Sequence, residues 1–364
     1  MKLGVVGLPN VGKSTLFNAI TSAGAECANY PFCTIEPNIG TTIVPDYRLD
    51  ALSKLYKTKN TVYATIEFVD IAGLVKGASA GEGLGNKFLG HIRAVNAIVH
   101  VVRCFDDPNI VHVDSSVDPI RDIEIINLEL AMADYDSIKK RREKAEKLVK
   151  TGDKAYADET DLCKKIEKAL EQGKAARSLE YTKNEMAILE GFFLLTANPV
   201  IYCANLGEGD IGNADKNPHV LKVRQLAKEE GAEVIELCAK IEAEIAQLPS
   251  DERKFFMEEL NLKTSGLDEM IKAGYKLLGL ISYLTAGEKE CRAWTIEKGT
   301  NAKQAAGKIH TDFEKGFIRA EIIGFDDLIA LGGHVQAKEK GKVRLEGKDY
   351  IVCDGDVVLF RFNV

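Results

Sequence analysis

The residues from Gly7 to Ser14 have the types and spacing of a phosphate-binding loop. They read Gly-Leu-Pro-Asn-Val-Gly-Lys-Ser and match the pattern G-x-x-x-x-G-K-[ST] between a predicted strand and a predicted helix. In such a loop, backbone N–H groups surround phosphate oxygens, and the helix N-terminus adds partial positive charge. Lys13 should contact the β- and γ-phosphates and take part in catalysis, and Ser14 should bind Mg²⁺. The expected nucleotide contacts of this loop are Asn10, Val11, Gly12, Lys13, Ser14 and Thr15.

A second pattern, Asp70-Ile71-Ala72-Gly73, directly follows another predicted strand. A carboxylate at a strand end can hold Mg²⁺ through water, and a glycine N–H can contact the γ-phosphate. We therefore expect Asp70 and Gly73 to take part in catalysis. We also expect Asp70 to hold the metal ion through a water molecule. Thr34 is our choice for a third metal ligand that closes over Mg²⁺ when a triphosphate binds, with Thr41 and Thr42 as competitors. Together these residues predict an Mg²⁺-dependent nucleoside triphosphatase.

The segments that must position these residues alternate between strands and helices. Short apolar runs predict strands at residues 2–8, 61–69, 97–102, 199–204 and 232–237. A helix is expected from Lys13 to about Thr21. This alternation is typical of an α/β layered sheet.

The stretch from about Asp118 to Thr196 interrupts this alternation with apolar residues at helical spacing, which predicts an inserted antiparallel helical hairpin. Its residues 138–150 carry seven basic and two acidic side chains. On a projecting helix these cations could engage phosphates. The competing interpretation is a solvated helix face with pairs such as Glu143–Lys147 and Glu146–Lys150. The basic residues are Lys139, Lys140, Arg141, Arg142, Lys144, Lys147 and Lys150.

The pattern of predicted strands and helices changes again after about Leu277, where a small α+β domain is predicted. Strand-like segments occur at residues 291–296, 318–323, 342–345, 350–352 and 357–362. A helix is expected over residues 300–313, with Asn301 or Thr300 as its cap.

Composition excludes several classes of protein. The 48 basic and 55 acidic residues give a net charge of −7, which rules out a globally basic nucleic-acid coat. No apolar run approaches the length of a membrane span, and no signal peptide precedes the phosphate-binding loop. The eight scattered cysteines form no Cys-x-x-Cys, so reduced thiols in the cytoplasm are expected. A redox role for Cys33 remains the alternative to inert cysteines.

The glycine-rich tract of residues 73–86 carries a family resemblance. It reads Gly-Leu-Val-Lys-Gly-Ala-Ser and, from residue 81, Gly-Glu-Gly-Leu-Gly-Asn. With the two nucleotide-binding patterns it is similar to the Obg-related GTPases, and the whole chain resembles the YchF/Obg-like ATPase family. Residues 299–306 with Ile309-His310 resemble a TGS domain, a β-grasp module.

The resemblance implies an architecture and a partner. The expected fold is an α/β P-loop NTPase (GTPase-like) with a mixed sheet, an inserted helical hairpin and a C-terminal ubiquitin-like β-grasp domain. The expected boundaries are residues 1–120 plus 197–277 for the nucleotide-binding domain, 121–196 for the arm and 278–364 for the TGS domain. The family implies association with the ribosome, on its large subunit or RNA, through the basic arm and the TGS domain. We expect a monomer with no membrane contact and no sequence-specific DNA binding.

The base-reading loop departs from the usual GTPase pattern Asn-Lys-x-Asp, because it reads Asn205-Leu206-Gly207-Glu208. A longer carboxylate cannot make the same paired hydrogen bonds to guanine, and a misaligned buried carboxylate costs specificity. Asn205, Leu206 and backbone carbonyls could accommodate adenine, so ATP is predicted over GTP. Ala239 lies in the Cys-Ala-Lys loop that should border the base. The alternatives are a GTPase with relaxed base recognition, or a nucleotide-sensing RNA-binding module whose hydrolysis is incidental.

The residue that orients the attacking water is not evident. Leu74 stands where related proteins often have a glutamine, and it has no polar group. His91 on the following helix is one candidate, and a partner protein is another. Slow intrinsic turnover, used as a timer, is therefore expected. Asn10 would also permit K⁺ binding.

Overall fold

The computed structural model describes residues 1–23, 38–71, 84–110, 116–150 and 152–363. Contacts divide the chain into two compact units, Met1–Thr41 with Glu67–Met270, and Thr42–Ile66 with Ile271–Val364. Residues 42–66 therefore group with the C-terminal unit, whereas the prediction assigned them to the nucleotide-binding domain of residues 1–120. Within the described residues, no helix combines the length and the apolar character that crossing a membrane requires.

The first sheet is built from six strands in the order β2-β4-β1-β5-β6-β7. β1 pairs in parallel with β4 and β5, β5 with β6, and β6 with β7. Every residue of β5 and β6 is buried, which explains why both read as uninterrupted apolar runs. The bounds are β1 (Lys2–Val6), β2 (Ile39–Ile43), β4 (Thr65–Asp70), β5 (Ala97–Arg103), β6 (Val200–Asn205) and β7 (Glu233–Leu237).

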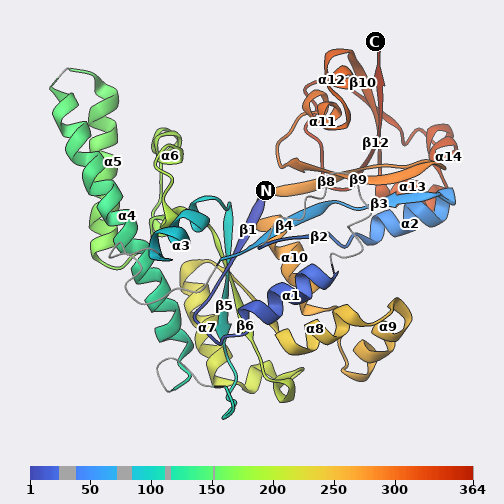
Figure 1. The fold of residues 1–364 in the computed structure, drawn as a ribbon. Helices are drawn as coiled ribbons and strands as arrows, with labels where there is room; N and C mark the ends of the chain where they lie inside the picture. Colours follow the sequence, from blue (N-terminus) through green and yellow to red (C-terminus); the bar gives the residue numbers. More distant parts are fainter. Residues whose placement is uncertain (24–37, 72–83, 111–115, 151, 364) are drawn as a thin grey trace. The chain divides into compact units, whose positions relative to one another are not determined.

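Helices flank this sheet, and α1 (Lys13–Ala23) packs against α8 (Ala239–Gln247). Figure 1 shows α1 starting where β1 ends, which is the arrangement that a phosphate-binding loop requires. The other helices are α3 (Leu84–Arg93), α7 (Pro218–Glu230), α9 (Ser250–Glu259) and α10 (Gly266–Leu277). Short 3-10 turns span Ala176–Ser178, Leu195–Ala197, Glu208–Asp210 and Ala214–Lys216.

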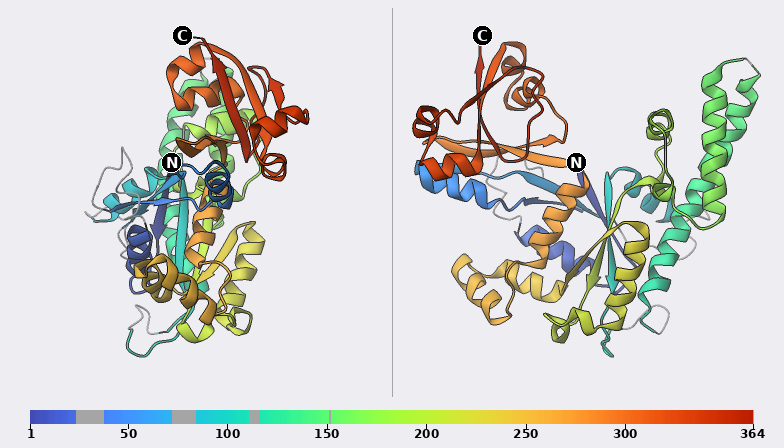
Figure 2. Two further views of the ribbon diagram at one scale, coloured as in Figure 1. Left: turned by 90° about the vertical axis from the view of Figure 1, so that its right-hand side faces the viewer. Right: turned by 180° about the vertical axis from the view of Figure 1, so that it is seen from behind.

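The inserted segment is a helical hairpin, as predicted. α4 (Pro119–Val149) and α5 (Lys154–Glu171) run side by side in Figures 1 and 2, and α6 (Lys183–Glu190) follows. Asp118 and Asp153 cap the first turns of α4 and α5 by accepting backbone N–H bonds. The seam between the helices is apolar and includes Ile138, Leu162, Cys163, Ile166 and Leu170.

A buried carboxylate fixes α4 to the end of the inserted segment. Asp134 accepts hydrogen bonds from the backbone N–H groups of Leu195 (3.0 Å) and Thr196 (2.7 Å), and from the Thr196 hydroxyl (2.6 Å). Burial raises the pKa of Asp134 above its ordinary value, and these hydrogen bonds partly oppose the shift.

The second sheet has the order β11-β10-β12-β8-β9-β3. Its strands are β3 (Asn60–Val62), β8 (Leu280–Thr285), β9 (Glu290–Glu297), β10 (Phe317–Gly324), β11 (Arg344–Glu346) and β12 (Asp356–Phe362). Its helices are α2 (Tyr47–Tyr56), α11 (Ala302–Ile309), α12 (Thr311–Lys315), α13 (Phe325–Leu331) and α14 (His334–Glu339). The sheet is mixed, because β8 pairs antiparallel with β9 and parallel with β12.

Three predictions about this unit need correction. The predicted strand at 61–69 is two strands in different sheets, because β3 pairs with β9 and β4 pairs with β1. The predicted helix at 300–313 is two helices, α11 and α12, which meet at the extended residue His310. Residues 350–352 contribute only an isolated bridge between Asn301 and Ile351. Asn301 does cap α11, in a capping box with Gln304.

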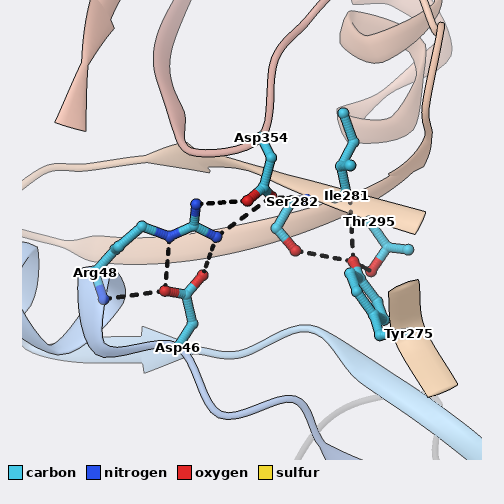
Figure 3. Close-up of polar contacts among 7 residues, drawn as sticks. All are labelled: Asp46, Arg48, Tyr275, Ile281, Ser282, Thr295 and Asp354. Atoms are coloured by element: carbon cyan, nitrogen blue, oxygen red, sulfur yellow. Dashed lines mark hydrogen bonds and ion pairs between the residues drawn. The ribbon is translucent and has the colours of Figure 1, made fainter. Parts of the chain in front are cut away.

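An arginine ties α2 to the loop before β12 within the second unit (Figure 3). The Arg48 guanidinium donates to Asp46 at 2.9 and 2.8 Å and to Asp354 at 2.8 and 3.3 Å. Asp354 in turn accepts from the backbone N–H of Ser282 on β8. We call this group of three charged residues, Asp46, Arg48 and Asp354, the Arg48 latch. It links residues 42–66 to the C-terminal part of the same unit.

Candidate functional site

The phosphate-binding loop has the backbone conformation that its glycines and Asn10 predict. Asn10 (φ +62°) and Gly12 (φ +94°) are both left-handed, and loops of this kind turn successive N–H groups toward an anion. A Cβ at Gly12 would collide with the side-chain amide nitrogen of Asn205, and one at Gly7 would lie 2.7 Å from the Val101 carbonyl oxygen. Glycine is therefore required at both positions.

Lys13 begins α1 and is buried, and its ammonium group contacts the carboxylate of Asp70. Asp70 is the last residue of β4 and pairs with Val5 of β1. Two predicted site residues from different segments are thus brought together at the end of the parallel strands, where ligands of α/β sheets bind. Ser14 and Thr15 are exposed on the first turn of α1.

The oxygen donors at this point fit Mg²⁺. A serine hydroxyl (Ser14) and an aspartate carboxylate (Asp70) are hard oxygen ligands, the kind that Mg²⁺ takes from proteins together with phosphates and water. Thr34 and Gly73 lie outside the described residues, as do Leu74 and Cys33. His91 is exposed on α3, and its catalytic part stays a prediction.

Asn205 connects the phosphate-binding loop to the base-reading loop. Its side-chain amide donates to the Val11 carbonyl (2.8 Å) and accepts from the Ala239 backbone N–H (2.9 Å), and the residue is only 4% exposed. Since both ends of the amide have backbone partners, Asn205 positions the two loops. The amide keeps a second N–H and a second lone pair, so its contact with the base stays a prediction.

The base-reading loop holds its carboxylate in an ion pair. Glu208 Oε1 lies 2.5 Å from Lys240 Nζ at the exposed start of α8, and this contact raises the pKa of Lys240. Leu206 is almost fully buried and donates its backbone N–H to the Leu237 carbonyl. The loop thus presents an aliphatic residue and a carboxylate already paired with a cation, in place of the lysine and aspartate of Asn-Lys-x-Asp.

A cavity of about 830 Å³ joins these loops, which is within the usual range for small-molecule sites. It is lined by the predicted residues Asn10, Gly12, Thr15, Asn205, Leu206, Glu208 and Ala239. A further wall was missed by the sequence analysis and consists of Phe105, Asp106, Asp107 and Ile110, in the loop after β5.

Arg103, the last residue of β5, holds this wall in place through hydrogen bonds to its backbone. Its guanidinium is almost fully buried and donates to the backbone carbonyls of Phe105 (3.0 Å), Ile110 (3.0 Å) and Asp107 (3.3 Å). It also lies 4.6 Å from the centre of the Phe105 ring. A lone arginine ending an apolar strand was the available signal, because such a cation must find acceptors nearby.

The basic segment of the arm is partly neutralised across the hairpin. Arg141 pairs with Glu159 (2.5 Å), and Arg142 pairs with Glu167 (2.6 Å) and Glu146 (3.1 Å). Glu146 also lies 3.5 Å from Lys164 of α5. Both arginines therefore stabilise the hairpin. The exposed cations of this segment are Lys139, Lys140, Lys144, Lys147 and Lys150.

Comparison with known proteins adds to this geometry. Residues 2–146 match a family model described as 50S ribosome-binding GTPase, and residues 280–363 match one described as Protein of unknown function (DUF933). A Bacillus subtilis (strain 168) protein named Ribosome-binding ATPase YchF is 57% identical over 99% of each chain. One of the same name from Escherichia coli O157:H7 is 54% identical over 100% of this chain and 99% of its own.

A solved structure resembles the whole chain. It is described as the Schizosaccharomyces pombe YchF GTPase, with 41% identity, a TM-score of 0.89, and coverage of 99% of this chain and 97% of that one. With these full-length relatives, the phosphate-binding loop, the altered base-reading loop and the helical arm have a common explanation: the chain belongs to the YchF family.

Proposed function

We propose that this protein is a cytoplasmic, Mg²⁺-dependent ATPase that acts as a molecular switch and associates with the ribosome. Lys13 would neutralise the β- and γ-phosphates, and Ser14 and Asp70 would hold Mg²⁺, Asp70 through water. Bound Mg²⁺ would offset the charge of the phosphate oxygens. The name that the bacterial relatives carry, Ribosome-binding ATPase, supports both the activity and the partner.

The preference for ATP rests on the loop that reads the base. In an Asn-Lys-x-Asp loop the aspartate accepts two hydrogen bonds from guanine. Here Glu208 is paired with Lys240, and the aliphatic Leu206 lines the cavity. Guanine would leave its donors without that acceptor, at a cost in specificity, whereas adenine does not need it.

Titration calorimetry with ATP and GTP, each with Mg²⁺ and K⁺, tests this proposal. We expect tighter binding of ATP, and a shift toward GTP in the double variant Leu206→Lys/Glu208→Asp, which restores Asn-Lys-x-Asp. Tighter binding of GTP by the wild type would support the alternative of a GTPase with relaxed base recognition, and the Schizosaccharomyces pombe protein is named a GTPase.

Hydrolysis is proposed to be slow without a partner. The chain has Leu74 where a water-orienting glutamine is usual, so His91 or a group from the ribosome would position the water. Asn10 would allow K⁺ to assist. Stimulation of ATP turnover by ribosomes would favour the molecular switch. Ribosome affinity that is the same with ATP, with ADP and without nucleotide would favour the nucleotide-sensing RNA-binding module.

We further propose that the arm (residues 121–196) and a TGS-like β-grasp built on residues 278–364 make the ribosomal contacts, on RNA of the large subunit. The protein would act as a monomer and bind no DNA sequence. The mixed sheet with α11 packed on β9 and β10 is compatible with a β-grasp. Co-sedimentation with purified bacterial 50S subunits, with ATP and with ADP, tests this partner.

A further inference from the structure

One face of the arm forms a groove of about 510 Å³ between α4, α5 and residues 192–194. Its walls include Lys140 and Lys144 on α4, Tyr156 on α5, and the buried Phe192. The groove lies within a single helical hairpin, whose two helices share a continuous apolar seam. Phe192 and Leu194, which complete the wall, belong to the same buried cluster as this seam.

The groove is cationic. Lys140 and Lys144 are one helical turn apart and exposed, and Arg141 lies between them in the chain. Glu159 is the acidic residue of the lining, so its ionisable side chains sum to a charge of +2. Arg141 donates to Glu159 and to the Gly191 carbonyl, and these two bonds use two of its five N–H donors. Its guanidinium carbon also lies 4.3 Å from the centre of the Phe192 ring, a cation–π contact that helps to hold the side chain in place.

An exposed aromatic residue, Phe193, lies in the chain between two residues of the groove's lining, Phe192 and Leu194. Phe193 is 73% exposed, although its neighbours Phe192 and Leu194 are buried, and it has a left-handed backbone with φ +51°. For a bulky residue this conformation is unfavourable, and it persists only where the surrounding structure enforces it. Both the strain and the exposed apolar surface oppose folding, so the arrangement points to a use for the ring in binding.

A cationic groove beside an exposed aromatic ring is the usual combination for binding a single-stranded nucleic acid. The cations contact the phosphodiester backbone, and the ring stacks on a base whatever its sequence. We propose that this groove binds an unpaired segment of RNA, with Lys140, Arg141 and Lys144 on the phosphates and Phe193 stacked on a base. This inference rests on the proposed ribosome association and specifies which face of the arm makes the contact.

The test compares charge reversals of equal size on two faces of the arm. Lys140→Glu/Lys144→Glu changes the groove, whereas Lys154→Glu/Lys168→Glu changes exposed lysines of α5 outside its lining. A third variant, Phe193→Asn, removes the ring but keeps a residue that tolerates the left-handed backbone. Binding is measured to purified bacterial 50S subunits by co-sedimentation, and to a labelled 20-nucleotide polyuridine by fluorescence anisotropy over a series of salt concentrations.

We expect the groove variant to bind both probes at least tenfold more weakly than the control variant. Its slope of log affinity against log salt should fall by about 1.4, since each phosphate contact on a single strand contributes about 0.7. Phe193→Asn should weaken polyuridine binding about tenfold and leave the salt slope unchanged, because stacking is worth about 1–3 kcal/mol per base.

Three results would overturn the inference. They are equal losses in the groove and control variants, unchanged 50S binding by the groove variant, and 50S binding that polyuridine does not compete for, which would indicate a protein partner. If the wild-type protein does not bind 50S subunits, the proposed ribosome association fails instead. In that case the polyuridine measurement alone decides whether the groove binds RNA.

Discussion

Replacing Asn205 by alanine should separate the positioning of the nucleotide loops from the reading of the base. The change removes the bonds to the Val11 carbonyl and to the Ala239 N–H. Each lost hydrogen bond is worth about 1 kcal/mol, and each backbone group left buried without a partner adds a desolvation penalty of about 1 kcal/mol or more. We therefore expect a decrease of about 4 kcal/mol in the free energy of unfolding.

The effect on affinity follows from the same two bonds. Without them, nucleotide binding must itself hold the phosphate-binding loop against the start of α8. If about 2 kcal/mol of the lost stabilisation must then come from binding, Kd rises about 30-fold. Because Asn205 contacts backbone atoms, ATP and GTP should weaken by the same factor. Titration calorimetry with both nucleotides measures this.

Asp134→Ala is the matched control. It removes three buried hydrogen bonds to Leu195 and Thr196 in the arm, so a similar loss of stability in urea unfolding is expected, with ATP affinity unchanged. Asn205→Ala would refute this reasoning if it changed the ratio of ATP to GTP affinity, since Asn205 would then read the base directly. Unchanged affinity for both nucleotides would refute it equally.

Three further predictions concern the rest of the chain. Burial lowers the pKa of His100 from 6.5 to about 3, so the folded state keeps it neutral while the unfolded state takes up a proton below about pH 6.5. Stability should therefore fall with decreasing pH by up to about 1.4 kcal/mol per unit, and His100→Leu should flatten this slope in urea unfolding between pH 7 and 5; an unchanged slope would contradict the assignment. Arg48→Met removes the guanidinium partner of Asp46 and Asp354 in the Arg48 latch and should cost about 2 kcal/mol of unfolding free energy, whereas Lys342→Met at an exposed pair with Asp327 should cost under about 1 kcal/mol. Equal costs would count against the latch. Gly12→Ala forces a side chain onto a left-handed residue and against the Asn205 amide, so calorimetry should show ATP affinity reduced more than tenfold; wild-type affinity would show that the loop can move aside.

The parts of the site that local chemistry specifies could be predicted from the sequence. The phosphate-binding loop needs glycine, lysine and serine at fixed spacing between a strand and a helix, and Lys13 and Asp70 do meet at the strand ends. Arg103 at the end of an apolar strand indicates that acceptors lie nearby, but the sequence does not say which carbonyl groups supply them, because that depends on how residues 105–110 fold. The role of Asn205 was hidden for the same reason, since its partners are distant in the sequence.

Pairing between distant segments also explains what the predicted fold lacked. Residues 61–69 have one continuous strand-like composition, yet β3 pairs with β9, and Asn60 faces Glu290 across 230 residues of sequence. No local pattern marks the point where the chain leaves one sheet for another. The arm was predicted correctly because its helical spacing is local, whereas the pairing of Arg141 and Arg142 with α5 depends on the register of the hairpin.

The membership of residues 42–66 in the second unit sets an order of events during synthesis of the chain. α2 and β3 are made early, but β9, which pairs with β3 and packs on α2, is completed only at Glu297. Until then the apolar side chains of Leu49 and Leu52, which are fully buried in the folded protein, have no core to enter. Non-local pairing of this kind slows folding and exposes apolar surface to aggregation or chaperones. A shortened gene product ending near residue 277 would keep that liability permanently, and one starting near 278 would lack an edge strand of its sheet.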